Sequence, residues 1–471
     1  MLKRSELPDA FRPILPQLLY KPDRNRIETK ALEEASEETG LSAPKLLAEC
    51  GALPSSHDYH LGRFLFEHFP RGFEFPAVDV PEPPADLPRA AAQAFSLDDV
   101  TTTEIDDAFS VTWVDDRTAR VGIHIAAPGL AIAPGTPIDA VARERLSTAY
   151  MPGTKITMLP PAVIERFTLA EGRVCPAVSL YADVDRATFT LRSTDSRVEQ
   201  VPVAANLRHH DVDVLNDHFA AAEHAPGDGP FVAELWFLYN FARSLEAARG
   251  KGAAGPGERV EYSFYVEDDR VRIEPRKRGA PLDILVAELM ILANSAWGRL
   301  LDEHGAAAIY RAQGPAGRVR MTTAAAEHQG LGVTHYAWST SPLRRYVDLV
   351  NQWQLLAVLQ GGTPPFAPGS ESLLAALRDF ELTYAAYDEF QRQMEHYWCL
   401  RWLLQEKVRL ARTVVVRDNL VKFADLPLFV RVPSLPDLAP GTEAMVEVVE
   451  VDLIDTQVRC VYKKPQQQES A

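Results

Sequence analysis

The stretch Ser96-Leu-Asp-Asp-Val-Thr-Thr-Thr-Glu-Ile-Asp-Asp-Ala108 decides the fold and the chemistry of this chain. Five carboxylates fall within ten residues, and the nearest basic residues are Arg89 and Arg117. Like charges held so close repel one another unless cations neutralise them, and Mg²⁺ and Mn²⁺ prefer carboxylate oxygens. A solvated acidic turn is the alternative. Because the cluster leads directly into an apolar strand, the pattern favours a divalent-metal site, which suits phosphoryl transfer.

A second motif reads Thr340-Ser-Pro-Leu-Arg-Arg-Tyr-Val-Asp348. Its hydroxyls and paired arginines stand at the start of an expected helix, where the helix N-terminus and the guanidinium groups both favour phosphate. The motif therefore indicates an anion site. The alternative is that Arg344 and Arg345 form ordinary ion pairs, for example with Asp348 at helical spacing.

The 471 residues suggest about three domains. Residues 1–76 read as helices, 77–410 as a mixed α+β domain, and 411–471 as short strands typical of an OB-type barrel. In the first module, Gly40 separates two helical stretches and Ser42 is placed to cap the second, which is the helix-turn-helix pattern. That module is either a nucleic-acid-binding unit or a plain helical hairpin used for packing.

Hydrophobic periodicity gives the main elements and an α+β multidomain fold class. Strands are expected at 109–113, 119–125 and 177–184, and helices at 231–249, 283–303, 345–360 and 373–410. The C-terminal strands are expected at 413–416, 428–432, 444–451 and 457–462.

The overall charge and composition exclude several classes of protein. A net charge of -16 argues against coating nucleic acid by bulk attraction, although a locally basic channel is compatible with it. The four cysteines form no C-x-x-C pair, which fits a reducing cytoplasm. No stretch approaches the roughly 18 apolar residues that cross a bilayer, so we expect no membrane partner.

Both motifs resemble the catalytic (RNB) domain of the ribonuclease II and R exoribonucleases, whose signatures are D-x5-D-x-D-D and T-S-P-[IL]-R-[RK]-Y-x-D. Further matches follow in the family's order over roughly 89–400: Val121-Gly-Ile-His-Ile-Ala126, Tyr150-Met-Pro-Gly153, Thr157-Met-Leu-Pro160, Ala287-Glu-Leu-Met-Ile-Leu-Ala-Asn294 and Ile309-Tyr-Arg311. The resemblance implies a monomeric, Mg²⁺-dependent (Mn²⁺ as an alternative) 3′→5′ exoribonuclease that degrades single-stranded RNA processively to nucleoside 5′-monophosphates.

The resemblance also implies roles for individual residues. The metal-binding centre would comprise Asp98, Glu104, Asp106 and Asp107, with Asp98 and Asp107 as direct ligands. The catalytic residues would be Asp106, Asp107 and Arg344. RNA would be contacted by Tyr150, Arg344, Arg345 and His209, and packing in the core is the alternative for Tyr150. A buried RNA path would be lined by Arg276, Lys277, Arg278, Arg344 and Arg345.

The chain departs from the family pattern in several places. Glu104 stands where the family usually has Asp, and its extra methylene shifts the carboxylate by more than about 1 Å. His209 stands near the position of a base-stacking tyrosine. The family's late helical glutamate corresponds to Glu389 or Glu395, and each is alternatively a surface charge.

The helices of residues 1–76 replace the family's usual cold-shock domains, so we expect tolerance of structured RNA, including duplexes with a 3′ overhang. One rival function is a non-catalytic nucleic-acid-binding regulator with a degenerate RNB domain. A second rival is a phosphoesterase for small substrates.

Overall fold

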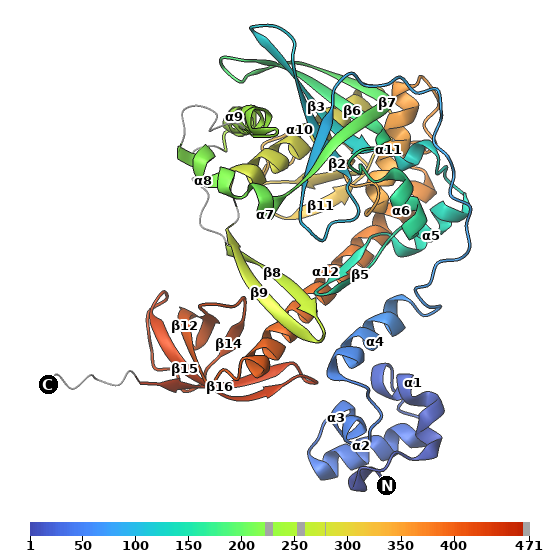
Figure 1. Ribbon diagram of the computed structural model, residues 1–471. Helices are drawn as coiled ribbons and strands as arrows, with labels where there is room; N and C mark the ends of the chain where they lie inside the picture. The colour runs from blue at the N-terminus through green and yellow to red at the C-terminus, as the bar shows by residue number, and fades with distance from the viewer. Residues whose placement is uncertain (222–228, 252–259, 278, 465–471) are drawn as a thin grey trace, which may run out of the picture.

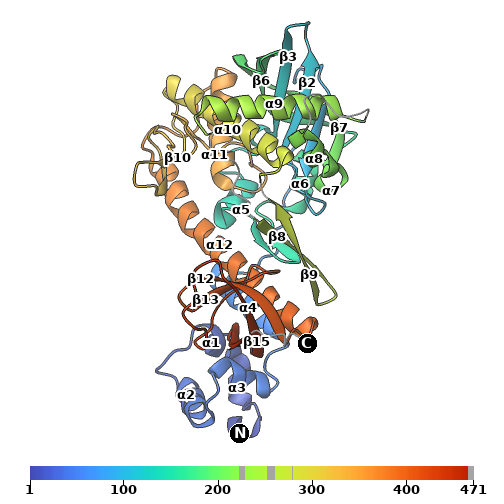
Figure 2. The ribbon, with the colours of Figure 1, turned by 90° about the vertical axis from the view of Figure 1, so that its left-hand side faces the viewer.

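The computed structural model describes residues 1–221, 229–251, 260–277 and 279–464. The molecule is elongated (Figure 1): a large α+β domain occupies one end, and the N-terminal helices and C-terminal strands lie together at the other. A single long helix, α12 (Glu371–Gln405), runs from the first part to the second, as the rotated view also shows (Figure 2).

The N-terminal module consists of short helices around a small apolar core. Its elements are two 3-10 helices (Leu2–Arg4 and Asp9–Ile14) and helices α1 (Leu15–Tyr20), α2 (Ile27–Thr39), α3 (Ala43–Glu49) and α4 (Ser56–His68). The predicted glycine turn is confirmed, because Gly40 ends α2 with a φ of 71°. The predicted side-chain cap by Ser42 is wrong: its Oγ donates to Asp455 Oδ1 instead, at 3.1 Å.

The central domain is built on a closed barrel of five strands. These are β1 (Ala94–Asp98), β2 (Asp107–Trp113), β3 (Thr118–Ala126), β6 (Val174–Asp185) and β7 (Leu191–Arg208), in the order β1-β2-β3-β6-β7. The predicted strands are confirmed. Closure was not predicted, because it depends on the parallel pairing of β1 with the end of β7, about a hundred residues away in the chain.

A buried histidine holds three strands of this barrel together. His124 on β3 exchanges hydrogen bonds of 2.8 Å with Ser110 on β2 and with Ser179 on β6. Burial lowers the pKa of His124 to about 3, so the imidazole is neutral. A Cβ at Gly122 would lie 2.4 Å from the Ser110 oxygen, so this network requires glycine there. The Val-Gly-Ile-His-Ile-Ala motif is therefore structural.

Helices surround the barrel. They are α5 (Pro137–Arg145), α6 (Pro161–Phe167), α7 (His209–Val212), α8 (Val214–Ala221), α9 (Val232–Ala248), α10 (Pro281–Glu303) and α11 (Tyr346–Leu359), together with a 3-10 turn at Pro128–Leu130. The predicted helices are confirmed, although α12 ends at Gln405, five residues before the predicted 410.

Helix α10 corrects the expectation about membrane-spanning stretches. By length and composition it is apolar enough to cross a membrane, and it is the single such helix in the described part of the chain. Leu285, Leu289 and Trp297 of α10 are buried in one cluster with barrel residues such as Ile123. Half of its most apolar window is buried inside the protein, as in the core helix of a globular domain.

Three small two-stranded sheets complete the domain: β4 (Ala149–Met151) with β5 (Thr154–Ile156), β8 (Val260–Glu267) with β9 (Arg270–Lys277), and β10 (Tyr310–Gln313) with β11 (Val319–Thr322). The β8–β9 hairpin was not predicted. It packs on α12, and Val266 of β8 lies against the β4–β5 turn at Gly153, where a Cβ would approach within 2.7 Å. Gly153 also has a φ of 84°, so this turn needs glycine on both counts.

The C-terminal strands form one antiparallel sheet. They are β12 (Leu410–Arg417), β13 (Leu420–Phe423), β14 (Phe429–Arg431), β15 (Glu443–Asp452) and β16 (Gln457–Lys463), in the order β14-β13-β12-β15-β16. The two edge strands contact each other, and the backbone N–H of Tyr462 donates to Ser434 Oγ at 2.8 Å. The sheet is thus nearly closed, consistent with the predicted OB-type barrel.

The N-terminal module is docked on this C-terminal sheet. Lys45, on α3, forms ion pairs with Asp452, the last residue of β15, and with Asp455 in the β15–β16 turn. His60 Nε2 of α4 lies 2.8 Å from the carbonyl oxygen of Leu453 in the same turn. We call this set of contacts the junction.

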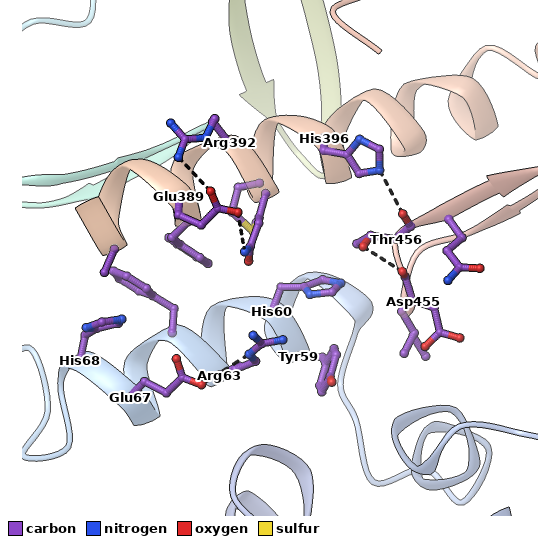
Figure 3. A pocket seen from close by; sticks show the side chains of 17 residues that line it. Tyr59, His60, Arg63, Glu67, His68, Glu389, Arg392, His396, Asp455 and Thr456 are labelled. Atoms are coloured by element: carbon purple, nitrogen blue, oxygen red, sulfur yellow. Dashed lines mark hydrogen bonds and ion pairs between the residues drawn. The ribbon is translucent and has the colours of Figure 1, made fainter. Parts of the chain in front are cut away.

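A groove of about 860 Å³ opens beside the junction, between α4, α12 and the β15–β16 turn (Figure 3). His396 of α12 closes one side of it, with Nε2 3.0 Å from the carbonyl oxygen of Thr456. Because the start of α3 is occupied by the protein's own C-terminal sheet, these contacts support the packing alternative for the helix-turn-helix-like segment.

Candidate active site

The acidic cluster lies at one end of the closed barrel. Strand β1 ends at Asp98 and β2 begins at Asp107, and Phe95 pairs with Phe109 in antiparallel register. This hairpin register brings the end of β1 beside the start of β2. The loop between them carries Glu104 and Asp106, so the fold gathers the predicted carboxylates at one site.

Asp106 joins the two sequence motifs. Its Oδ2 accepts a hydrogen bond from Arg344 Nε at 3.0 Å, and its Oδ1 accepts one from the backbone N–H of Leu343 at 2.8 Å. The side chain is buried. Burial raises the pKa of Asp106 to about 7, and the positive charge of Arg344 opposes that rise. The carboxylate therefore fixes the position of the guanidinium.

Glu104 is held by partners on the β4–β5 hairpin. Its Oε1 accepts a hydrogen bond from Thr148 Oγ1 at 3.0 Å, and its Oε2 forms an ion pair with the ammonium of Lys155. Lys155 also donates to Thr103 Oγ1 at 2.8 Å. Only 4% of Glu104 is exposed, and both of its carboxylate oxygens are occupied within the protein. Lys155 lies outside both sequence motifs and was not predicted as a site residue.

Among the described residues, Asp98 and Asp107 are the carboxylates of the cluster that form no direct ion pair. Asp98 Oδ2 is buried with no hydrogen-bond partner, and burial raises the pKa of Asp98. Burial, with the charges of Asp98 and Asp106, raises the pKa of Asp107 to about 8. Both residues are half-buried, and the charges of nearby arginines only partly offset this effect. Two neighbouring carboxylates of this kind are a donor set that suits a hard divalent cation, so these residues fit the expected metal.

The predicted set of four metal ligands is not assembled as such. Within the described ranges, no three His, Cys, Asp or Glu side chains converge on a point that could hold a metal ion. The reason is that Glu104 faces Lys155 and Asp106 faces Arg344, which leaves Asp98 and Asp107. Metal binding by this pair stays a prediction.

A cavity of about 210 Å³ lies beside Arg344. Tyr150 and Arg345, whose contacts with RNA stay a prediction, line it together with four residues of α12 that were not predicted: Tyr384, Tyr387, Asp388 and Gln391. Their spacing of three and four residues places them on one helix face, and this was the available signal. The cavity combines aromatic rings and guanidinium groups, which suits a nucleotide.

Tyr150 is half-buried and adjoins the charged residues of the site. Burial raises its pKa, the charge of Arg344 opposes that rise, and the charge of Glu104 adds to it. Part of its side chain lines the cavity beside Arg344. Tyr150 is therefore partly packed within the protein, as the core alternative expected, and partly exposed to the cavity, as an RNA contact requires. Its contact with RNA stays a prediction.

Arg345 forms the ion pair with Asp348 that the alternative named, although the pair is buried and not at the surface as that alternative expected. Its Nη2 donates to Asp348 Oδ1 at 2.8 Å, and its guanidinium carbon lies 4.0 Å above the ring of Trp338. Asp348 also accepts a hydrogen bond from the backbone N–H of Ser341 at 2.9 Å, and it is fully buried. Arg345 thus holds the motif's turn in place, while Arg344 faces the acidic cluster.

His209 lies apart from the cavity beside Arg344. It lines a separate cavity of about 730 Å³ between α7, α8 and the β8–β9 hairpin, with Asp99 and Arg276. Of the predicted basic path, Arg276 pairs with Asp99 and with Asp283. Arg278 lies outside the described residues, and the side chain of Lys277 is not among those described.

Neither candidate for the late helical glutamate lines the cavity beside Arg344. Glu389 is exposed and pairs with Arg392, as expected for a surface charge. Glu395 is half-buried and accepts a hydrogen bond from Gln391 Nε2 at 2.9 Å, so it reaches the cavity only through Gln391. Asp388 is the acidic residue of α12 that does line it.

The chain belongs to the family described by the RNB domain model, which matches residues 89–325 and 317–361. An uncharacterized ribonuclease from Synechocystis is 28% identical over 352 residues, covering 69% of this chain and 51% of the relative. Exoribonuclease 2 from Aeromonas hydrophila is 25% identical over 347 residues, covering 61% and 50%. The chain thus spans about half the length of these curated relatives.

Solved structures share the fold at low identity. The Dss1 exoribonuclease from Candida glabrata gives a TM-score of 0.75 at 17% identity, covering 97% of this chain and 67% of that one. RNase R from Mycoplasma genitalium gives 0.71 at 14%, covering 86% and 78%. The yeast pseudonuclease Ssd1 gives 0.63 at 16%, covering 84% and 58%. Since 97% coverage leaves few residues unmatched, the Dss1 likeness extends into the N-terminal helices.

Proposed function

We propose that this chain is a metal-dependent 3′→5′ exoribonuclease that degrades single-stranded RNA processively to nucleoside 5′-monophosphates. The observation that carries the proposal is the Arg344–Asp106 ion pair at 3.0 Å, which joins the second motif, residues 340–348, to the acidic cluster. The family membership and the names of the relatives support the same activity.

The cation, Mg²⁺ or Mn²⁺, would be held by Asp98 and Asp107, because Asp98 Oδ2 is buried without a hydrogen-bond partner and the charge of Asp98 raises the pKa of the neighbouring Asp107. When bound, such an ion activates water and stabilises the leaving oxygen of a phosphodiester.

The chain's own residues bind and orient the RNA. Arg344 donates one N–H to Asp106 and another to Ser341 Oγ, each at 3.0 Å. A guanidinium group has five N–H donors. The remaining donors are available to the scissile phosphate and to the charge that develops on it. Tyr150 and Tyr384, at the same cavity, would stack on the terminal nucleotides.

Further parts of the proposal concern the RNA and its surroundings. The helical module that precedes the RNB domain supports entry of duplexes that carry a 3′ overhang. RNase R from Mycoplasma genitalium has been solved with ribose-methylated single-stranded RNA and with double-stranded RNA. All four cysteines are unpaired thiols, which supports a cytoplasmic location. We propose that the chain acts as a monomer.

One specific observation favours a second candidate function. Glu104 replaces the family's usual Asp and is occupied by Lys155, as in a site that has lost a ligand, and a pseudonuclease shares the fold. The alternative is therefore a non-catalytic RNA-binding regulator.

A time course on 5′-labelled poly(A) tests the proposal, run with Mg²⁺ and with EDTA. We expect the labelled strand to be shortened from its 3′ end to a short final product with few intermediate lengths, mononucleotides to be detected by chromatography, and no degradation in EDTA. A duplex with a 3′ overhang, run in parallel, tests entry into structured RNA; stalling well before the base-paired region would contradict that part. RNA binding without any mononucleotide release would favour the regulator.

A further inference from the structure

We propose that Lys155 is a positioning residue that keeps Glu104 out of the cation site and ties the β4–β5 hairpin to the acidic cluster. The inference rests on the proposed function, and it concerns a residue outside both sequence motifs. It makes the cation site of this chain a site of two carboxylates, Asp98 and Asp107, from which Glu104 is withdrawn.

Both carboxylate oxygens of Glu104 already have partners within the protein. Its Oε2 is paired with the Lys155 ammonium and its Oε1 with the Thr148 hydroxyl, while the residue is nearly fully buried. A divalent cation bound through Oε2 would have to displace Lys155 or lie within a few ångströms of its positive charge. Both are unfavourable at a buried position, so Glu104 is satisfied without a metal.

The length of the Glu104 side chain explains how it reaches these partners. Glutamate carries its carboxylate one methylene, about 1.5 Å, further from the backbone than aspartate does. That reach brings Glu104 to partners on a different element, the β4–β5 hairpin, while Asp98 Oδ2 remains buried without a partner. Glu104 and Lys155 therefore act as a matched pair: each charge compensates the other.

Lys155 lies opposite Tyr150 on the β4–β5 hairpin. The two residues face each other across the β4–β5 ladder, so their side chains project from the same face of the hairpin. Thr148, the other partner of Glu104, lines the cavity beside Arg344 together with Tyr150. Anchoring Glu104 to Lys155 and Thr148 thus fixes the hairpin that presents Tyr150 to the terminal nucleotide.

Lys155 also lines a second cavity and is partly exposed to solvent. Lys155 and Thr103 line a cavity of about 610 Å³ on the other side of Glu104, together with Phe75 and Arg145. Glu104 therefore stands between two cavities, with Thr148 on the side of Arg344 and Lys155 on the other. A quarter of the Lys155 side chain is exposed, so replacing it does not require rebuilding a core.

The test uses Mn²⁺ alone as the probe, titrated into the RNA-free chain by calorimetry. The double variant Glu104→Gln/Lys155→Met removes the pair without changing the net charge. We expect its Mn²⁺ affinity to stay within threefold of the wild type, whereas Asp98→Asn, the matched control at a proposed ligand, loses at least tenfold. Lys155→Met alone frees an acid and is expected to bind Mn²⁺ at least threefold more tightly.

The positioning role is tested on RNA. The double variant is expected to raise KM for a short oligonucleotide at least threefold with a smaller change in kcat, and Lys155→Arg, which keeps the charge, is expected to restore a KM near that of the wild type. Thermal unfolding of each variant verifies that it is folded; if Lys155→Met alone is not, the double variant carries the test.

A tenfold or larger loss of Mn²⁺ affinity in the folded double variant would overturn the inference, because Glu104 would then be a ligand. A wild-type chain that binds no Mn²⁺ would overturn it as well. Failure of the proposed function is a separate result: the wild type would bind Mn²⁺ and still release no mononucleotides from RNA.

Discussion

The acidic cluster and the junction are both held by ion pairs, yet they differ in depth and in origin. At the cluster, Asp106 and Glu104 are each at most 4% exposed. At the junction, the Lys45 side chain is 29% exposed and its partner Asp455 is 30% exposed. Breaking a buried pair leaves an uncompensated charge, whereas an exposed pair is worth little. The same type of contact therefore serves chemistry in one region and docking in the other.

The largest expected effect comes from Asp106→Asn. The amide lacks the negative charge that holds Arg344 Nε, so the guanidinium loses its fixed position beside the phosphate. We expect kcat to fall at least about 10²-fold, as for loss of one transition-state donor. RNA affinity is expected to change less than threefold, since the cavity residues remain. Single-turnover kinetics and a filter-binding titration measure the two quantities.

Asp116→Asn, at an exposed position of the β2–β3 turn, is the matched control and should leave both quantities unchanged. Wild-type rates in Asp106→Asn would remove the basis for assigning the active site.

A smaller effect is expected from Lys45→Met at the junction. The substitution leaves Asp452 and Asp455 without their common cation, which should loosen the contact by up to about 1 kcal/mol. Hydrogen exchange of the α3 and α4 amides should rise by up to about fivefold, while degradation of single-stranded RNA stays unchanged.

Lys30→Met, an exposed lysine of α2, serves as the control. If Lys45→Met reduced kcat as strongly as Asp106→Asn does, the two regions would not be separable as chemistry and docking.

The smallest effect is a pH dependence of the junction. Burial acts to raise the pKa of Asp452, but Lys45 and the backbone N–H groups of Asp455 and Ile454 together lower it. A carboxyl with a lowered pKa contributes stability above its unfolded pKa of about 3.9, and that stability is lost as the pH falls through the lower folded value.

The difference in urea midpoint between the wild type and Lys45→Met should therefore be present at pH 6 and shrink below about pH 4. A difference that grows on acidification would contradict the assigned role of Asp452.

The fold and the site also differ in how much of each could be predicted from the sequence. Both charged motifs are short and continuous, so residues 98–107 and 340–348 were enough to predict the family, which the RNB domain model confirms, and the phosphate chemistry, which stays a prediction. Most strands and helices follow from apolar periodicity, since the core face of each element repeats in the sequence. His209 was placed near the site by motif order, but the fold puts it in another cavity.

The sequence alone was enough to predict the class of protein, the acidic cluster and Arg344 as its arginine, because these depend on residues close together in the chain. The tertiary structure alone decided which carboxylates are free. The partners of Glu104 and Asp106 lie about 50 and 240 residues away, and charge compensation depends on distance in space. It also decided the junction, where residues near the two ends of the chain meet with no motif to mark them.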